Sequence, residues 1–192
     1  MEKFLGKKNV AVFISGRGSN LKFLIKYSKS KNSLINIALV ISNNPNAKGL
    51  EYANKSKIKN IGYKYINKKI FENKCLKLLK KYKIDVLCLA GFMKILSSNF
   101  IKNFSKPILN IHPSLLPKYK GLNTHYRALK NKDKFAGASV HLVNEKLDSG
   151  RIILQKKIRI LKKDNTKSLE KKVLKIEHQI YVKGIIKYLT NL

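Results

Sequence analysis

The stretch that decides the fold reads Ile108-Leu109-Asn110-Ile111-His112-Pro113-Ser114-Leu115-Leu116-Pro117. Its first half predicts a buried strand, and Pro113, which lacks a backbone N–H, ends that strand and begins a proline-bounded loop. Asn110 and His112 are two residues apart, so their side chains point to the same face of the strand. An amide donor beside a titratable imidazole suits a developing oxyanion, and sites form where such strands end. A satisfied polar pair at the entry of a loop is the alternative interpretation.

Outward from this stretch, strand-like and helix-like segments alternate along the chain. The apolar patterns predict strands over residues 10–15, 35–41, 61–66, 84–90, 108–112, 138–143 and 152–158. They predict helices after residue 18, over 47–57, around Phe71 to Lys83, and over 166–189 with Thr166 or Ser168 as the cap. This order predicts an α/β fold, a Rossmann-like, mainly parallel sheet with helices on both faces. The short loop between the last two strands predicts an antiparallel strand near one edge.

Length and composition predict a single globular domain over residues 1–192. The chain is 44% hydrophobic, which is enough for a sizeable core, and no linker or internal repeat divides it. It has no run of about 18 apolar residues and no signal peptide, which predicts no contact with a membrane. Cys75 and Cys88 lack metal-ligand spacing, and Cys88 reads as a small buried hydrophobe. With no sign of disulfides, we expect a cytoplasmic protein.

The net charge of +32 raises the question of nucleic-acid binding. Almost all of the excess is lysine spread along the chain, and the arginines are limited to Arg17, Arg127, Arg151 and Arg159. Recognition of phosphates and base edges uses arginine forks as well as lysines. Lys, Asn, Ile and Tyr are abundant and share A/T-rich codons, so genome base composition is a sufficient cause. We therefore expect no specific nucleic-acid partner and only weak attraction to polyanions.

The first strand ends in Ser15-Gly16-Arg17-Gly18-Ser19-Asn20-Leu21. Glycines let backbone amides approach an anion, and the amino end of the following helix favours negative charge. The segment lacks the Gly-Lys-Ser/Thr ending of a P-loop and the third glycine of a dinucleotide fingerprint. It predicts a site for a phosphate monoester, and a tight turn with a helix cap is the alternative.

A third feature combines Gly137-Ala138-Ser139-Val140-His141 with Leu147-Asp148-Ser149-Gly150. Ser139 and His141 share one face of a strand, and Asp148 follows in a glycine-ended loop. A carboxylate near His112 would orient and charge the imidazole. Spacing alone does not bring residues 112 and 148 together, and a solvated aspartate in a turn is the alternative.

Taken together, these segments resemble a known family. SGRGSNL, LAGFMKILS, NIHPSLLPKYKG, GASVHLV, LDSG and the late Glu177-His178 occur in the order and spacing of the phosphoribosylglycinamide formyltransferases of purine synthesis. The resemblance covers nearly the whole chain and implies the formyltransferase fold. It also implies that the enzyme transfers a formyl group from 10-formyltetrahydrofolate, a co-substrate, to the amine of 5'-phosphoribosylglycinamide.

The resemblance further implies a role for each matching residue. The catalytic trio is Asn110, His112 and Asp148. The ribonucleotide contacts are Gly18, Ser19, Asn20 and Glu177. The folate contacts are Lys68, Met93, Lys94, Ile95, Leu96, Asn110, Asn144 and Asp148, with Lys69 as the alternative to Lys68. In this scheme protonated His112, kept charged by Asp148, and the Asn110 amide stabilise the formyl oxygen, without a metal or a covalent intermediate. The expected enzyme is a monomer or a homodimer.

Three alternatives stay open at this stage. Methionyl-tRNA formyltransferases share the NIH-like and SLLP segments, but they carry a further C-terminal domain and lack the SGxGSN start. Formyltetrahydrofolate deformylases share the core but carry an N-terminal regulatory domain. A non-catalytic nucleic-acid-binding relative is the third, and the intact Asn110, His112 and Asp148 argue against it.

Overall fold

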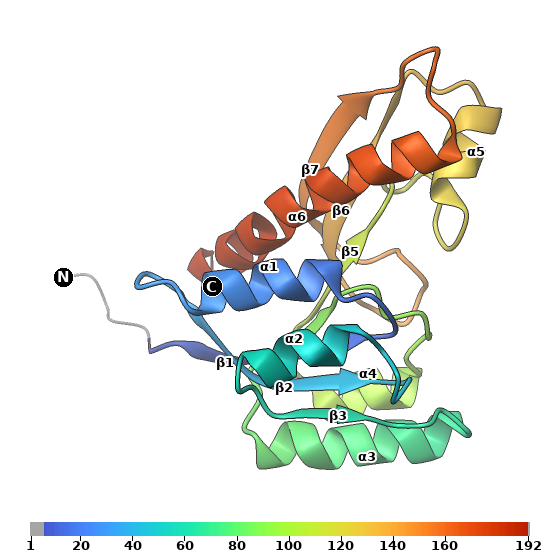
Figure 1. The fold of residues 1–192 in the computed structure, drawn as a ribbon. Helices are drawn as coiled ribbons and strands as arrows, with labels where there is room; N and C mark the ends of the chain where they lie inside the picture. The colour runs from blue at the N-terminus through green and yellow to red at the C-terminus, as the bar shows by residue number, and fades with distance from the viewer. Residues whose placement is uncertain (1–5, 192) are drawn as a thin grey trace. The chain divides into compact units, whose positions relative to one another are not determined.

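The computed structural model describes residues 6–191, and Figure 1 shows its elements in order along the chain. Contacts between Cα atoms divide the chain into two compact units, Met1–Ile108 and Leu109–Leu192. The expectation of one catalytic domain over residues 1–192 stays a prediction.

The first unit is built on a parallel sheet in the order β3-β2-β1-β4. All its strand pairs are parallel. The bounds are β1 Lys8–Ile14, β2 Ile35–Ser42, β3 Asn60–Gly62 and β4 Val86–Leu89. Val10 to Ile14 on β1 are fully buried, as expected for a strand covered on both faces.

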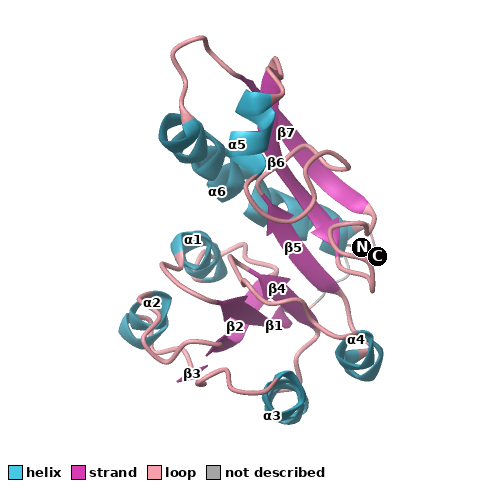
Figure 2. Cartoon of the chain, turned by 90° about the vertical axis from the view of Figure 1, so that its right-hand side faces the viewer, coloured by secondary structure: helices cyan, strands magenta, loops and turns pink. Residues whose placement is uncertain are grey.

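Four helices cover this sheet, and Figure 2 shows α1 and α2 on one face and α3 and α4 on the other. Their bounds are α1 Ser19–Ser28, α2 Gly49–Lys55, α3 Lys68–Lys81 and α4 Ser98–Phe104. The prediction of a parallel sheet with helices on both faces is therefore confirmed in this unit. β1 and β4 are in parallel register, with Phe13 opposite Leu89, so the loops that follow them leave the same edge of the sheet.

The second unit contains β5 (Ile108–His112), β6 (Phe135–Leu142) and β7 (Ile152–Arg159). β6 is antiparallel to both β5 and β7, which confirms the predicted antiparallel strand near one edge of the sheet. The helices are α5 (Thr124–Lys130) and α6 (Thr166–Thr190), and α6 packs on β6 and β7.

Several local expectations were wrong. The strand expected over 61–66 is only Asn60–Gly62. α6 is capped by Asn165, and Ser168 is the third helical residue, whose hydroxyl completes a capping box. The seven-residue helices α4 and α5 were not expected, because two turns are too short to show a helical period.

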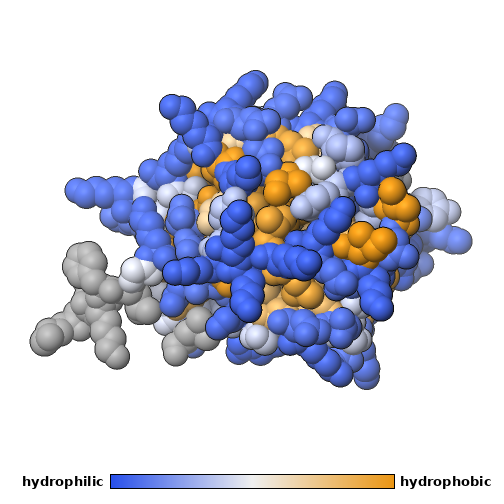
Figure 3. Space-filling model, turned by 90° about the horizontal axis from the view of Figure 1, so that it is seen from below, coloured by the Kyte–Doolittle hydropathy of each residue, from blue (hydrophilic) through white to orange (hydrophobic). Residues whose placement is uncertain are grey.

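Lysines dominate the surface of α3. Seen from below, on the side of α3, hydrophilic side chains cover most of the molecule and hydrophobic ones show between them (Figure 3). The helix has exposed lysines at Lys68, Lys69, Lys74, Lys77, Lys80 and Lys81. Apart from Lys68 at the first helical position, these lysines point away from the buried Phe71, Cys75 and Leu79, as a solvated face does.

Close packing between α6 and β6 depends on Gly184. A Cβ added there would lie 2.7 Å from Cγ1 and 2.8 Å from Cβ of Val140, which is fully buried. Replacing a helical glycine by alanine normally stabilises a helix by up to about 1 kcal/mol. Overpacking a well-filled core costs about 1–3 kcal/mol, so the clash should outweigh the gain.

We therefore predict that Gly184→Ala lowers the free energy of unfolding by about 1–2 kcal/mol, measured by urea denaturation. Adding Val140→Ala should make the alanine at 184 neutral or stabilising, because the two changes are coupled. Gly6→Ala, where an added Cβ meets nothing within 4 Å, is the control. Additive effects of the two core substitutions would contradict this packing account.

Candidate active site

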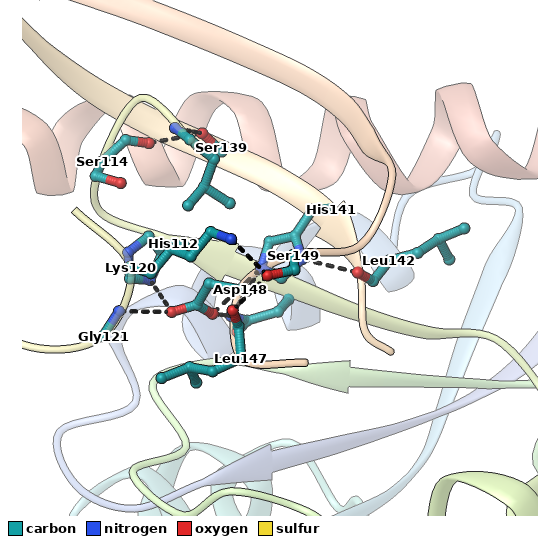
Figure 4. Close-up of polar contacts among 12 residues, drawn as sticks. His112, Ser114, Lys120, Gly121, Ser139, His141, Leu142, Leu147, Asp148 and Ser149 are labelled. Carbon is teal, nitrogen blue, oxygen red and sulfur yellow. Dashed lines mark hydrogen bonds and ion pairs between the residues drawn. The ribbon is translucent and has the colours of Figure 1, made fainter. Parts of the chain in front are cut away.

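The register of β5 and β6 sets the polar cluster of the second unit. The side chains of Asn110 and His112 point to the same face of β5. In the sheet register, Asn110 lies opposite His141 of β6, and His112 lies opposite Ser139. Asp148 comes from the loop after β6. Figure 4 shows the His112, His141 and Asp148 side chains directed toward one another. The structure thus brings together His112 and Asp148, the pair for which sequence alone left the contact open.

Asp148 is held on a tightly closed loop. Its backbone is in the left-handed region, with φ 45°. The loop returns to β6 at Gly150, where any Cβ would collide with the Leu142 carbonyl oxygen. The side chain is only 8% exposed. Glycine at 150 is therefore what lets Asp148 reach the face of β5.

The two carboxylate oxygens of Asp148 contact different neighbouring groups. Oδ2 accepts a 2.9 Å hydrogen bond from the Gly121 backbone N–H and lies 3.4 Å from Nδ1 of His112. Oδ1 lies 3.5 Å from the Asn110 amide nitrogen and 3.6 Å from Nε2 of His141. Burial raises the pKa of Asp148, but the nearby His141 ring, the hydrogen bond from the Gly121 N–H and the His112 ring outweigh this effect. The net pKa lies below its usual value, so the group is a carboxylate at neutral pH.

His112 is oriented by a backbone carbonyl. Its Nε2 lies 2.9 Å from the carbonyl oxygen of Tyr119. A carbonyl can only accept, so Nε2 carries the hydrogen. Nδ1, on the side of Asp148, is then the nitrogen that can take up or give a proton.

The expectation that Asp148 keeps His112 charged is not supported. Burial lowers the pKa of His112, and the nearby His141 and Arg127 lower it further. The Tyr119 carbonyl and Asp148 raise it, yet the net pKa is below the ordinary value. The ring is therefore mostly neutral at pH 7 in the free protein, and any charge on it must arise during the reaction.

His141 was quoted in a motif but given no role by sequence reasoning. Its Nδ1 lies 2.8 Å from the Leu142 carbonyl oxygen, so Nδ1 carries the hydrogen. In that tautomer Nε2 is the acceptor for the Asn110 amide nitrogen, 3.2 Å away. This contact makes the amide nitrogen of Asn110, and not its oxygen, face Asp148. In the sequence, the two-residue spacing of Ser139 and His141 indicated that their side chains share one face of a strand. The sequence did not show that Asn110 lies opposite His141 in the sheet.

The first unit contains the glycine loop expected to bind phosphate. Gly18 caps α1 with φ 70°, without a side-chain cap, and no acidic residue lies in the first turn. No carboxylate in that turn therefore offsets the positive end of the helix dipole, so the amino end of α1 suits an anion. Close packing also explains the glycine at position 18, because an added Cβ would lie 2.5 Å from Cα of Gly49. Ser19 is half-buried and Asn20 is 5% exposed.

The segment expected to contact folate follows β4 in the same unit. The Met93 N–H donates to Ser15 Oγ at 2.7 Å, which ties this segment to the end of β1. Met93 and Ile95 are 65% and 59% exposed, whereas Leu96 is buried. Nζ of Lys94 lies 4.7 Å from the Tyr65 ring centroid. Met93 and Ile95 can therefore contact a ligand directly, and Leu96 supports them from the core.

The remaining expected residues are scattered. Lys68 and Lys69 are exposed at the start of α3. Asn144 is exposed and accepts from the Lys146 N–H at 3.0 Å. Glu177 is buried on α6. Over residues 6–191, no group of three or more His, Cys, Asp or Glu side chains could hold a metal ion, and no helix is long and apolar enough to cross a membrane. The binding roles of all these residues stay predictions.

Comparison with known proteins places the chain. The Formyl transferase family model matches residues 8–185. The phosphoribosylglycinamide formyltransferase of Haemophilus influenzae is 40% identical over 96% of this chain and 88% of its own length. The trifunctional purine biosynthetic protein adenosine-3 of Bos taurus is 41% identical, but the chain spans only 18% of it.

A solved structure agrees. The crystal structure of phosphoribosylglycinamide formyltransferase from Brucella melitensis has a TM-score of 0.89 at 39% identity, covering 95% of each chain. Family model, sequence and fold agree over nearly the whole length. The chain therefore belongs to the Formyl transferase family and, within it, to the phosphoribosylglycinamide formyltransferases.

Proposed function

We propose that this protein transfers the formyl group of 10-formyltetrahydrofolate to the amine of 5'-phosphoribosylglycinamide, in purine biosynthesis. The products are formylglycinamide ribonucleotide and tetrahydrofolate. The observation that carries the proposal is the convergence of Asn110, His112 and the Asp148 carboxylate in the second unit. Relatives that align with this chain over most of their own length are named phosphoribosylglycinamide formyltransferase.

The reaction is an acyl transfer through a tetrahedral intermediate. The amine nitrogen bonds to the formyl carbon, the carbonyl electrons move to oxygen, and the bond from carbon to N10 of the folate then breaks. One proton must pass from the attacking amine to the leaving nitrogen. The site must therefore stabilise an oxyanion and hold a proton in transit.

The three side chains divide these tasks. The Asn110 amide, turned by His141, donates to the oxyanion. His112, with Nε2 fixed on Tyr119, takes up the amine proton at Nδ1, hydrogen-bonds through it to the same oxygen, and then passes that proton to N10 of the folate as the bond from carbon to N10 breaks. Asp148 stabilises the imidazolium once it forms. Because the resting ring is neutral, its charge appears only when the substrate charge does, and this favours the transition state over the ground state.

Binding is assigned to the remaining residues. The loop of Gly18, Ser19 and Asn20 holds the ribonucleotide phosphate at the amino end of α1, and Glu177 contacts the glycinamide part. The folate rests on Met93, Lys94 and Ile95, which the buried Leu96 backs, with Asn144 from the loop before Asp148. A basic residue at the start of α3, Lys68 or Lys69, contacts the folate. The high content of lysine suits anionic substrates without specificity for nucleic acid.

The first prediction for this site concerns the trio. His112→Ala and Asp148→Asn should each lower kcat by at least about 100-fold, because each removes an oxyanion donor or the counter-charge of the imidazolium. The measurement is formyl transfer to the ribonucleotide, followed by the absorbance of the folate product, with circular dichroism to confirm folding. Near-normal turnover in either folded variant would refute the assigned roles.

A second prediction separates the two ligands. Ser19→Ala and Asn20→Ala should raise KM for the ribonucleotide by roughly 10-fold, since a lost hydrogen bond to a charged group costs about 1.5–3 kcal/mol. Their KM for the folate should hardly change. Met93→Ala, the matched control, should do the reverse. A rise in the folate KM of the loop variants would mean that the loop binds the other substrate.

A third prediction concerns the lysine-rich surface of the chain, whose hydrophilic character is visible from one side in Figure 3. If its charge follows from composition, binding to a DNA or RNA duplex should be weak, independent of sequence, and steeply lost between about 50 and 200 mM salt. Fluorescence anisotropy with two unrelated duplexes measures this. Tight binding to one duplex only, at physiological salt, would revive the nucleic-acid alternative.

A further inference from the structure

The loop after the cis Leu116–Pro117 bond meets both His112 and Asp148. Its Tyr119 carbonyl oxygen is the acceptor for His112 Nε2, and its Gly121 N–H donates to Asp148 Oδ2, both at 2.9 Å. Tyr119 and Gly121 have φ values of 56° and 76°. For tyrosine this left-handed conformation is disfavoured, so surrounding contacts must hold it.

Arg127 on α5 supplies such contacts. Its Nη1 donates to the carbonyl oxygens of Lys120 at 2.7 Å and Leu122 at 3.4 Å. Its guanidinium carbon lies 5.0 Å from the centroid of the Tyr119 ring. One planar group thus bonds to the backbone on either side of Gly121 and stacks on Tyr119. A lysine can offer the charge and donate hydrogen bonds, but it has no planar group that can also stack on the Tyr119 ring.

We infer that Arg127 is a positioning residue for formyl transfer: it fixes residues 119–122 so that the Tyr119 carbonyl and the Gly121 N–H hold His112 and Asp148 in reactive orientation. This inference rests on the proposed function. Arg127 does not touch the reacting atoms in this scheme and acts only through the loop.

Other contacts keep the loop attached when Arg127 is changed. The Tyr119 hydroxyl donates to Asp133 at 2.9 Å, and Lys118 forms an ion pair with the same carboxylate. Nζ of Lys120 donates to Ser149 Oγ at 2.6 Å. Substitution of Arg127 should therefore loosen the backbone of residues 119–122 without unfolding the unit.

Charge and position can be separated experimentally. The titratable and charged groups near His112 are Asp148 from the loop after β6, His141 on β6, and Arg127 and His125 on α5. The positive charge of Arg127 lowers the pKa of His112, whereas the Tyr119 hydrogen bond raises it. Arg127→Lys keeps the charge and removes the planar guanidinium that stacks on Tyr119. A positioning role thus predicts a fall in the pKa of His112, and a purely electrostatic role predicts no change.

The test is a pair of measurements on Arg127→Lys, Arg127→Met and the control Lys130→Met, an exposed position on the same helix. NMR titration of the His112 ring, assigned with His112→Gln, gives its pKa. Steady-state formyl transfer gives kcat and KM. We expect Arg127→Lys to lower the pKa of His112 by about 0.5 unit or more. It should lower kcat about 10-fold and change both KM values less than about threefold. Lys130→Met should match the unsubstituted protein.

Two results would overturn the inference. One is an unchanged His112 pKa and kcat in Arg127→Lys. The other is a rise of that pKa in Arg127→Met with no change in Arg127→Lys. This result would mean that Arg127 acts on His112 only through its positive charge. If the unsubstituted protein transfers no formyl group, the proposed function fails, and the titration still decides whether Arg127 holds the loop against His112.

Discussion

The chemistry of the second unit depends on one nearly buried carboxylate. Asp148 is surrounded by a backbone N–H, an amide and two imidazoles, and these come from β5, β6 and the loop before α5. A carboxylate can be buried only if such groups compensate for its lost hydration. Three features of the unit together place hydrogen-bond donors around this charge. They are the register of the strands, the left-handed backbone at Asp148 and the glycine at 150.

That arrangement also explains why a neutral resting His112 is useful. The ring is anchored at Nε2 by a carbonyl and faces the carboxylate with Nδ1. Burial opposes its charge, while Asp148 and Tyr119 favour it. A ring balanced in this way takes up a proton when charge develops nearby and returns it afterwards. The backbone of residues 119–122 is thus part of the catalytic apparatus, although it contributes no catalytic side chain.

Much of this could be predicted from the sequence. The two-residue period put Asn110 and His112 on one face, and the alternation of apolar segments predicted the α/β fold. The approach of Asp148 to Asn110 spans 38 residues and depends on strand pairing, which no local pattern encodes. His141 was missed as a partner for the same reason. Asn165 was missed as the cap of α6 because Thr166 and Ser168, next to it, are equally good capping residues. Arg127 carried no signal at all, because its partners are backbone carbonyls.

In the proposed mechanism, Asn110 and Nδ1 of His112 stabilise the formyl oxygen. The most direct measurement is a crystal structure with phosphoribosylglycinamide and a folate analogue that mimics the tetrahedral intermediate. We expect the oxygen that stands for the oxyanion to lie within about 3.2 Å of both Asn110 Nδ2 and His112 Nδ1, with His112 Nε2 still bonded to the Tyr119 carbonyl. An oxygen beyond hydrogen-bond reach of both groups, or a ring turned to present Nε2, would contradict it.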